Sequence, residues 1–476
     1  MGQKTTLTAV LLGALVVSGC ADFRAGRPGQ GGADAVTAPQ ARRGPLAAAG
    51  DGLAAMGSGL VETTRGAFGF LDRDEAPDAA PPARTLDPTM QDGTASEIIS
   101  TLLTRRSVLE PGPLRDVASA VLAANSRTAE AELRAARLRS AAAERNWLPS
   151  IGPQISLSSL GDVVSSLVVD AVLYDNGAKI AERDYARADV EVAAVALAEN
   201  TNERVMTALD LYLDAEASRA RAAVTQAALA RMERFDYVMA ERMRAGVADR
   251  ADRQLVAQRL SQMRSDLSSD REAAATARAE LAAMTAYPID DVSGVSDVAA
   301  PDPGAEPLSV MKARAEADRS VAEATVARAA QLPGLSATGS IVDGESSGGL
   351  VAGGTGIGFG TPAALRAIEA QREAASFQVA DAREAADRRL RQLSGQLASA
   401  QRQAREAQGI AAQAAETYAL QEAQLSTGRV SVNDVVGAFE TKVRAERTAA
   451  TLVYEATALR LRLAEAAGLL VNGDQM

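Results

Sequence analysis

The spacing of apolar and polar residues predicts a chain built mainly from long α-helices. From Ala178 to Ala245 apolar side chains return every three or four residues, with neither Gly nor Pro between them. That is the pattern of one unbroken helix, and at 1.5 Å per residue its roughly 68 residues span about 100 Å. A second long helix is expected from Thr361 to Thr427. Shorter helices are expected from Leu114 to about Trp147, from Arg250 to Thr285, from Leu308 to Gln331 and from Ser431 to near Gly468.

Two pairs of short strands separate these helices. From residue 165 to residue 174 apolar side chains hold every second position from Leu167 onward, while Ser166 and Asp170 lie on the other face. Alternation with period two predicts a strand with one apolar face and one face toward water. A shorter alternation around Ile155 precedes this strand. Two Gly-rich strands are expected near residues 335–341 and 350–358.

The segments between the strands and the long helices have the composition of helix starts. Asp175 or Asn176 can cap the helix that begins after Gly177, because both side chains accept hydrogen bonds from free backbone N–H groups. Before the second long helix, Thr361 is expected as the N-cap and Pro362 as the first helical residue.

Two tight turns between helices follow one sequence plan. In each, a helical pattern ends at a glycine, which supplies the left-handed residue after a helix. An N-cap residue follows three positions later and an aspartate three positions after that, which is close to a capping box. The two turns are roughly 182 residues apart, so the chain is a tandem repeat. The first turn has Gly246, Asp249 and Asp252, and the second has Gly428, Ser431 and Asp434.

In each repeat, the helix before the strands and the helix after the turn together match the length of the long helix between them. Each repeat is therefore two helices thick along its whole length. The chain divides into a signal peptide at 1–19, a flexible tether at 20–111, a first repeat at 112–287, a linker at 288–307 and a second repeat at 308–472.

Composition narrows the chemistry that this chain can perform. There are no histidines and one cysteine, which excludes a Cys/His zinc site, a His-based acid–base pair and an internal disulfide. No set of nucleophile and base is present, so we expect neither an enzyme nor a metal site nor a cofactor. A net charge of −11 argues against nucleic acid as a partner. Aromatic residues make up only 3% of the chain, as in long, closely packed helices.

The N-terminus has the plan of an export signal. A basic residue, Lys4, precedes an apolar run that is too short to span a bilayer as a mature helix. The run ends at Val17-Ser18-Gly19-Cys20, which resembles a bacterial lipobox, in which the cysteine is acylated and becomes the mature N-terminus. We therefore expect a covalent lipid on Cys20; the alternative is an ordinary signal peptide with an incidental cysteine. More than one acyl chain gives stable membrane anchoring.

The repeat plan resembles the TolC family of outer-membrane export channels, in its lipoprotein branch, over about residues 112–472. The resemblance rests on Leu148-Pro149, on the motif from Leu173 to Ala178, and on the turn from Gly428 to Val436. It implies a homotrimer in which each protomer supplies four helical strands to an α-barrel and four β-strands to a shared twelve-stranded β-barrel. The stretch from Leu148 to Gly177 is short for two membrane strands, so this β-barrel would be minimal. Tyr174 and Phe359 are its candidate girdle aromatics.

The resemblance also implies partners and roles for particular residues. A periplasmic adaptor protein and an inner-membrane transporter of the RND or ABC type would complete the machine. The turns at Gly246-Val247 and Gly428-Arg429 match the tips that meet the adaptor. Asp434 matches a family position at the closed entrance, and Asp252 holds the equivalent place in the first turn. The alternative for Asp434 is that it only caps its helix.

The functions that remain open are export of small molecules, type I protein secretion and a non-conducting, lipid-tethered rod or adhesin anchor. Lipidation favours small-molecule efflux. The protein would be anchored at the outer membrane and would extend into the periplasm. A neighbouring gene for a proton-driven pump would indicate efflux, and one for an ABC exporter would indicate secretion.

Overall fold

The computed structural model describes residues 95–124, 127–157, 163–342, 345–353 and 358–475. The chain divides into Met1–Ala80, which lies outside the described residues, and Pro81–Met476, to which the following account refers. The helices are α2 (Glu97–Leu103), α3 (Pro113–Ala123), α4 (Arg127–Glu144), α5 (Ala178–Arg244), α6 (Arg250–Ala282), α7 (Leu308–Ala330), α8 (Thr361–Ser426), α9 (Val432–Ala466) and a 3₁₀ turn, η1 (Gly473–Gln475). The strands are β1 (Ser150–Leu157), β2 (Val163–Tyr174), β3 (Gly334–Val342) and β4 (Glu345–Gly353).

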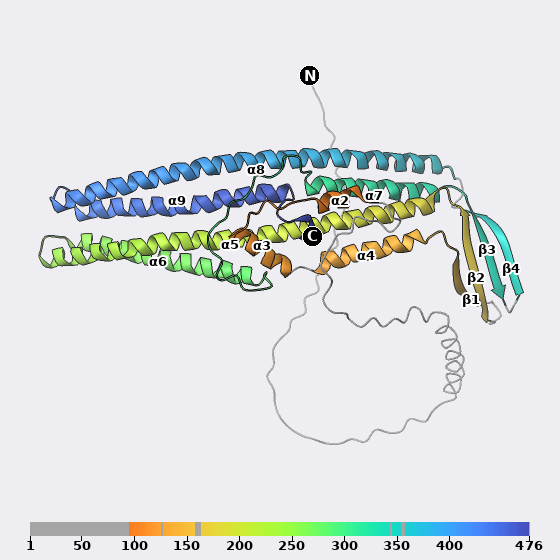
Figure 1. Cartoon of the computed structure of the whole chain (residues 1–476), viewed down its shortest axis with the longest axis horizontal. Coiled ribbons are helices and arrows are strands. Elements are labelled where there is room, and N and C mark those ends of the chain that lie inside the picture. The colour runs from red at the N-terminus through yellow and green to blue at the C-terminus, as the bar shows by residue number, and fades with distance from the viewer. Residues whose placement is uncertain (1–94, 125–126, 158–162, 343–344, 354–357, 476) are drawn as a thin grey trace, which may run out of the picture. The chain divides into compact units, whose positions relative to one another are not determined.

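Two long helices, α5 and α8, organise the two repeats. The shorter helices α4 and α6 lie one after the other along α5, and α7 and α9 lie in the same way along α8 (Figure 1). Because α5 also packs against α7 and α9, it joins the repeats. The predicted tandem plan and the two-helix thickness of each repeat are confirmed. None of the described helices combines the length and the apolar character needed to cross a membrane.

The four strands form one antiparallel sheet in the order β1-β2-β3-β4. Its register places Asp170 between Ser150 and Thr338, and Leu167 between Pro153 and Ile341. Residues directly opposite each other share a face of a sheet, so one face is largely polar and the other largely apolar. The apolar face is open to solvent in a single chain, where Ile151 is 64% exposed, Leu167 42%, Ile341 45% and Leu350 69%.

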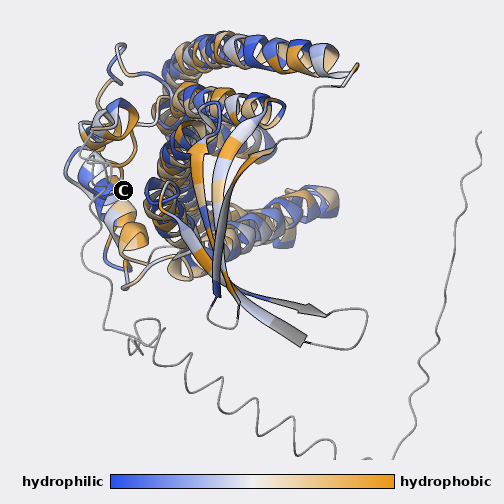
Figure 2. Cartoon of the chain, turned by 90° about the vertical axis from the view of Figure 1, so that its right-hand side faces the viewer, coloured by the Kyte–Doolittle hydropathy of each residue, from blue (hydrophilic) through white to orange (hydrophobic). Residues whose placement is uncertain are grey.

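Two hydrophobic clusters stabilise the helices. The first lies at mid-length, where α2, α3 and the C-terminal residues 467–471 pack against α5. The second joins α5, α6, α8 and α9 near the turns. In Figure 2, which looks along the helices from the sheet, the C-terminus lies on one side of the helical layer. That side carries the short elements of the first cluster.

The structure corrects the predicted tether. Residues 95–111 are packed against the helices, whereas the sequence places them in a flexible segment that ends at 111. Within that segment the Leu and Ile spacing suggests short helices at Gly59–Leu71 and Ala95–Arg105; α2 confirms the second, and the first lies outside the described residues. Ile99 and Leu102 of α2 are fully buried. The Arg105 guanidinium donates to the carbonyl oxygens of Ala467 at 2.8 Å and Gly468 at 3.0 Å, at the C-terminal end of α9 where carbonyls lack helical partners. The rest of the expected tether, and the signal peptide, lie outside the described residues.

The first expected helix is divided in two. The sequence pattern predicts one helix from Leu114 to about Trp147, but α3 ends at Ala123 and α4 begins at Arg127. Between them stand Asn125 and Ser126, outside the described residues, whose residue types favour helix caps over helix interiors.

The fourth strand also lies earlier than the sequence pattern places it. β4 runs from Glu345 to Gly353 rather than near residues 350–358, because Glu345 pairs directly with Val342 of β3. The two intervening residues are Asp343-Gly344, a dipeptide typical of two-residue hairpins. As a sequence signal, the Asp-Gly pair predicts the start of the strand better than the glycines farther along the chain.

Candidate functional site at the hairpin tips

The two helical turns, at Gly246 and Gly428, have the same backbone geometry. Both glycines are left-handed, with φ of 71° and 72°. Val247 N donates to Arg242 O at 3.0 Å, and Arg429 N donates to Gln424 O at 3.1 Å. These bonds close each helix in a Schellman motif, which occupies carbonyl groups that the helix end leaves free. The sequence-predicted turns are confirmed as paired hairpin tips.

The predicted N-caps of the return helices are also confirmed. Asp249 accepts a hydrogen bond from Ala251 N at 3.4 Å at the start of α6. Ser431 accepts from Asp434 N at 3.2 Å, and the Asp434 carboxylate accepts from Ser431 N at 3.0 Å, so the second turn has a full capping box. Each cap satisfies donors that the first turn of a helix leaves unpaired.

Asp252 and Asp434 hold equivalent sequence positions but make different contacts. Asp434 is exposed, and its hydrogen bonds from Ser431 keep its pKa below the ordinary value of 3.8. Asp252 instead accepts from Asn433 Nδ2 at 2.6 Å. The treatment of the two aspartates as equivalent is therefore wrong, because Asp252 links the first tip to the second while Asp434 caps its own helix. Nothing in a single chain places either one at an entrance, so that role stays a prediction.

Beneath the tips, three aromatic rings hold the two hairpins together. Phe439 of α9 meets Phe235 of α5 edge-on at 5.8 Å between ring centroids, and it meets Tyr418 of α8 at 5.1 Å. Arg231 Nε donates to the Tyr418 hydroxyl at 2.9 Å, and Arg231 also pairs with Glu422. Aromatic pairs of this kind stabilise a fold by more than the burial of their apolar surface alone. The two tips are therefore held together by packed side chains just below the turns.

Charged side chains extend this connection along the helices. Arg259 of α6 pairs with Glu440 of α9 at 2.9 Å. The Asp270 carboxylate of α6, only 6% exposed, lies 2.9 Å from Arg221 of α5 and 2.7 Å from Arg447 of α9. These residues could not be predicted from the sequence, because helix periodicity does not distinguish a buried aspartate from a solvated one.

At the opposite end of α5, the strand-to-helix turn is fixed by hydrogen bonds. The N-cap residue of α5 is Gly177. Asp175 accepts from Gly177 N at 3.0 Å and from Lys179 N at 2.6 Å, so its side chain, and not that of Asn176, satisfies a free N–H group of the first helical turn. Asn176 is left-handed, with φ of 56°, and its side chain donates to Pro333 O at 3.0 Å, in the turn between α7 and β3 of the second repeat. The two repeats are thereby joined where the helices meet the sheet.

The matching turn before α8 departs from the expectation by one residue. Gly360 is the N-cap, Thr361 is the first helical residue and Pro362 follows it. The Thr361 hydroxyl accepts from Gly358 N at 3.0 Å, outside the helix, and so it is not available to a helical N–H group. Proline is still within the first turn, where its missing N–H is not needed.

Large apolar side chains are exposed at this junction of helices and strands. Tyr174 is 61% exposed and Phe359 is fully exposed, as is expected of girdle aromatics, and Trp147, at 61%, joins them from the end of α4. In the sequence, Trp147 is predicted only as the end of a helix. Its position just before β1 is the signal that could have identified it as a further candidate girdle aromatic.

The residues that are expected to meet an adaptor lie on the exposed surface of the tips. Gly246, Gly428 and Arg429 are exposed, and Val247 is 66% exposed. Within the described residues no group of three acidic, His or Cys side chains is arranged to hold a metal ion. Cys20 lies outside those residues, so its lipidation stays a prediction.

No model of a protein family and no curated protein matches this chain, but solved structures do. It is similar to the outer membrane protein VceC of Vibrio cholerae, at 15% identity and a TM-score of 0.64, over 75% of this chain and 96% of that chain. It is similar to CusC at 15% identity and a TM-score of 0.65, over 83% and 99%. It is also similar to the open state of the Neisseria gonorrhoeae MtrE outer membrane channel, at 16% identity and a TM-score of 0.64, over 83% and 99%. The chain therefore has the TolC-like fold of these channels, as the sequence predicts.

Proposed function

We propose that three copies of this chain form a passive exit duct in the outer membrane, which carries small molecules delivered by a periplasmic adaptor and an inner-membrane pump. The observation that carries this proposal is the two-faced sheet. Its apolar face is open to solvent in one chain, although open apolar surface of this extent normally has a partner. A strand with one lipid-facing and one water-facing side is the pattern of a membrane barrel.

The edges of the sheet support a closed assembly. β1 and β4 each have one neighbour among the described strands, so each presents unpaired backbone groups. Closure removes such edges, and three chains with four strands each would give the expected twelve-stranded barrel.

The helices also carry exposed apolar side chains that a closed trimer would cover. Exposed apolar side chains lie on α8, where Phe377 and Ile410 are 58% exposed and Leu420 is 60% exposed. Others lie on the far side of the first repeat, where Leu138 of α4 is 65% exposed and Leu255 of α6 is 39% exposed. Contacts between neighbouring copies would cover both sets. Crosslinking in intact cells should accordingly stop at three protomers.

Cysteine labelling of β3 tests the membrane position. Thr338 lies on the polar face, opposite Asp170, and Ala337 lies on the apolar face, opposite Ala171. In native membranes, Thr338→Cys should react with a water-soluble maleimide, and Ala337→Cys should be shielded by lipid. The unaltered chain, whose Cys20 is acylated in this proposal, is the background control. Equal reaction at both positions in the membrane would contradict a lipid-embedded sheet.

Anchoring through Cys20 is tested separately. Palmitate should label the wild-type protein and not Cys20→Ser; equal labelling of both would rule out the lipid. The alternative of type I protein secretion is distinguished by deleting the gene. Loss of a secreted protein from the medium would favour secretion, and retention of small molecules in the cell would favour efflux.

A further inference from the structure

A groove of about 910 Å³ runs along α5 between α6 and α9. On α5 its lining includes Asp210, Asp214, Ala217 and Arg221, which follow one another at helical spacing. They form a single stripe, and the flanking helices supply the two walls.

The groove opens on the side of α5 opposite the linker. Tyr212 donates its hydroxyl to Gly294 O at 2.8 Å, and Glu216 accepts from Gly294 N at 3.0 Å. At about 100° per residue, Tyr212 and Glu216 lie across the helix axis from Asp210 and Asp214. The side of the helical layer with the C-terminus (Figure 2) is covered by the linker and the short helices. In the duct proposed above, the uncovered side that carries the groove would face the lumen.

The charges of the groove are not balanced within the chain. Arg221 shares the Asp270 carboxylate with Arg447, and Arg462 lies 3.4 Å from Asp210. Three other acids line the groove, namely Asp214, Glu280 and Glu455. These three are exposed and form no ion pair with another described residue. The groove therefore has an excess of negative charge.

Its remaining lining is apolar and aromatic. Leu213, Ala217, Ala458 and Leu459 contribute aliphatic surface, and the half-buried ring of Tyr454 stands among them. Ligand sites commonly combine an apolar lining with a few charged groups. An aromatic ring next to carboxylates is suited to a cation that carries an apolar body.

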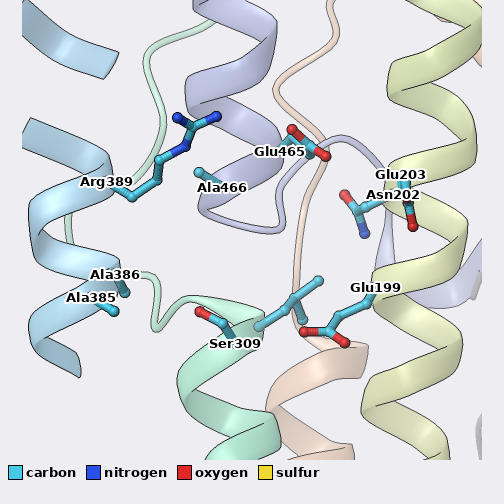
Figure 3. A pocket seen from close by; sticks show the side chains of 10 residues that line it. Glu199, Asn202, Glu203, Ser309, Ala385, Ala386, Arg389, Glu465 and Ala466 are labelled. Carbon is cyan, nitrogen blue, oxygen red and sulfur yellow. The ribbon is translucent and has the colours of Figure 1, made fainter. Parts of the chain in front are cut away.

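A second cavity of about 480 Å³ lies farther along α5, with Glu199, Glu203 and Glu465 in its walls and Arg389 on the facing helix (Figure 3). Glu199 is paired with Lys312 at 2.8 Å, so Glu203 and Glu465 supply its excess negative charge. Burial raises the pKa of Glu465, and the nearby carboxylates of Asp210 and Glu203 raise it further. Asp210 belongs to the groove and Glu203 to the second cavity, so the acidic groups of the two lie close enough to interact.

We propose that the groove between α5, α6 and α9 is a binding site for amphiphilic organic cations on their way through the duct. Asp214, Glu280 and Glu455 attract the positive charge, and Tyr454 with the aliphatic side chains contacts the apolar body. This inference rests on the proposed duct, because it places the groove on the lumen side.

The test uses the purified full-length protein in detergent and ethidium, an aromatic cation whose fluorescence reports binding. The groove variant combines Asp214→Asn, Glu280→Gln and Glu455→Gln. The matched control combines Asp290→Asn, Asp291→Asn and Asp297→Asn, which changes the net charge equally at exposed linker positions. All six side chains are exposed, so both variants should fold. We expect the groove variant to bind ethidium about tenfold more weakly, as the loss of three attractive charges requires, and the control to bind as the wild type does.

Tyr454→Leu should weaken ethidium binding about threefold while leaving the charge unchanged, because only the ring contact is lost. Equal affinity of the groove variant and the control would overturn the proposal, and so would no saturable binding to the wild type. Planar-bilayer recordings on the same preparations test the duct independently of ethidium binding to the groove. A conducting protein whose ethidium affinity is the same in both charge variants would disprove the groove and leave the duct standing. A protein that binds ethidium as expected and never conducts would disprove the duct.

Discussion

Single residues set the shape of each tip. Gly246 and Gly428 are left-handed at the same point of two Schellman motifs, and a Cβ atom at either position would meet no other atom within 4 Å. The requirement for glycine there comes from the backbone and not from crowding. These positions could be predicted from sequence because a glycine followed by a cap residue is a local signal. The bond between Asn433 and Asp252 could not, because it joins side chains far apart in the chain.

Gly428→Ala should destabilise the protein by about 1–2 kcal/mol, because alanine resists the left-handed conformation. Gly437, one turn into α9, has ordinary helical geometry and free space around its Cα, so Gly437→Ala should stabilise by up to about 1 kcal/mol. Denaturant unfolding of the full-length protein measures both. Changes of the same sign would refute the assignment of Gly428 to a left-handed cap.

Asp434 gives the second tip a pH dependence. Its pKa is lowered in the folded protein by hydrogen bonds from Ser431, so the cap is complete above the ordinary pKa of 3.8 and is lost as pH falls through the lower folded value. Amide exchange in the first turn of α9, corrected for intrinsic rates, should be slower in the wild type than in Asp434→Asn at pH 6. The difference should shrink as pH falls below the ordinary pKa of 3.8 and disappear once the carboxylate is protonated in the folded protein. A difference that persists in acid would show that the cap does not depend on the charge.

At the scale of elements, α5 is the helix against which most of the other helices pack. Its length could be predicted to within one residue, because nothing in its sequence interrupts the periodic pattern over Ala178–Arg244. Weak patterns were less informative. In the sequence, only two polar residues signal the break between α3 and α4, and only one Asp-Gly pair signals the start of β4. The ion pairs that join α5 to α6 and α9 leave no periodic signal in the sequence.

Asp270 provides a test of this joining. It lies buried between Arg221 and Arg447, whose side chains are 28% and 22% exposed. Asp270→Asn leaves both guanidinium groups without their counter-charge and should destabilise the protein by about 3 kcal/mol. Glu241→Gln removes an exposed partner of Arg244 and should cost less than about 0.5 kcal/mol. Similar midpoints for the two variants in denaturant unfolding would mean that the buried charges do not hold α5, α6 and α9 together.

At the scale of the whole molecule, the proposed trimer would cover the surfaces that a single chain leaves exposed. The sheet keeps two edges and an apolar face, the helices keep apolar stripes on both flanks, and the tips expose Val247 and Arg429. The repeat and the fold could be predicted from the sequence because each recurs as a pattern. The substrate could not, because a groove wall forms only when residues from α5, α6 and α9 come together.

Single-channel recording in planar bilayers tests the central claim most directly. The full-length protein, purified in mild detergent and added to one side, should produce discrete conductance steps of uniform size. A preparation carrying Ala171→Asp and Ala337→Asp, which puts facing charges on the apolar side of the sheet, should insert poorly and give few steps, because charges on a lipid-facing barrel surface are costly. Folded wild-type trimers that enter the bilayer and never conduct would contradict the duct.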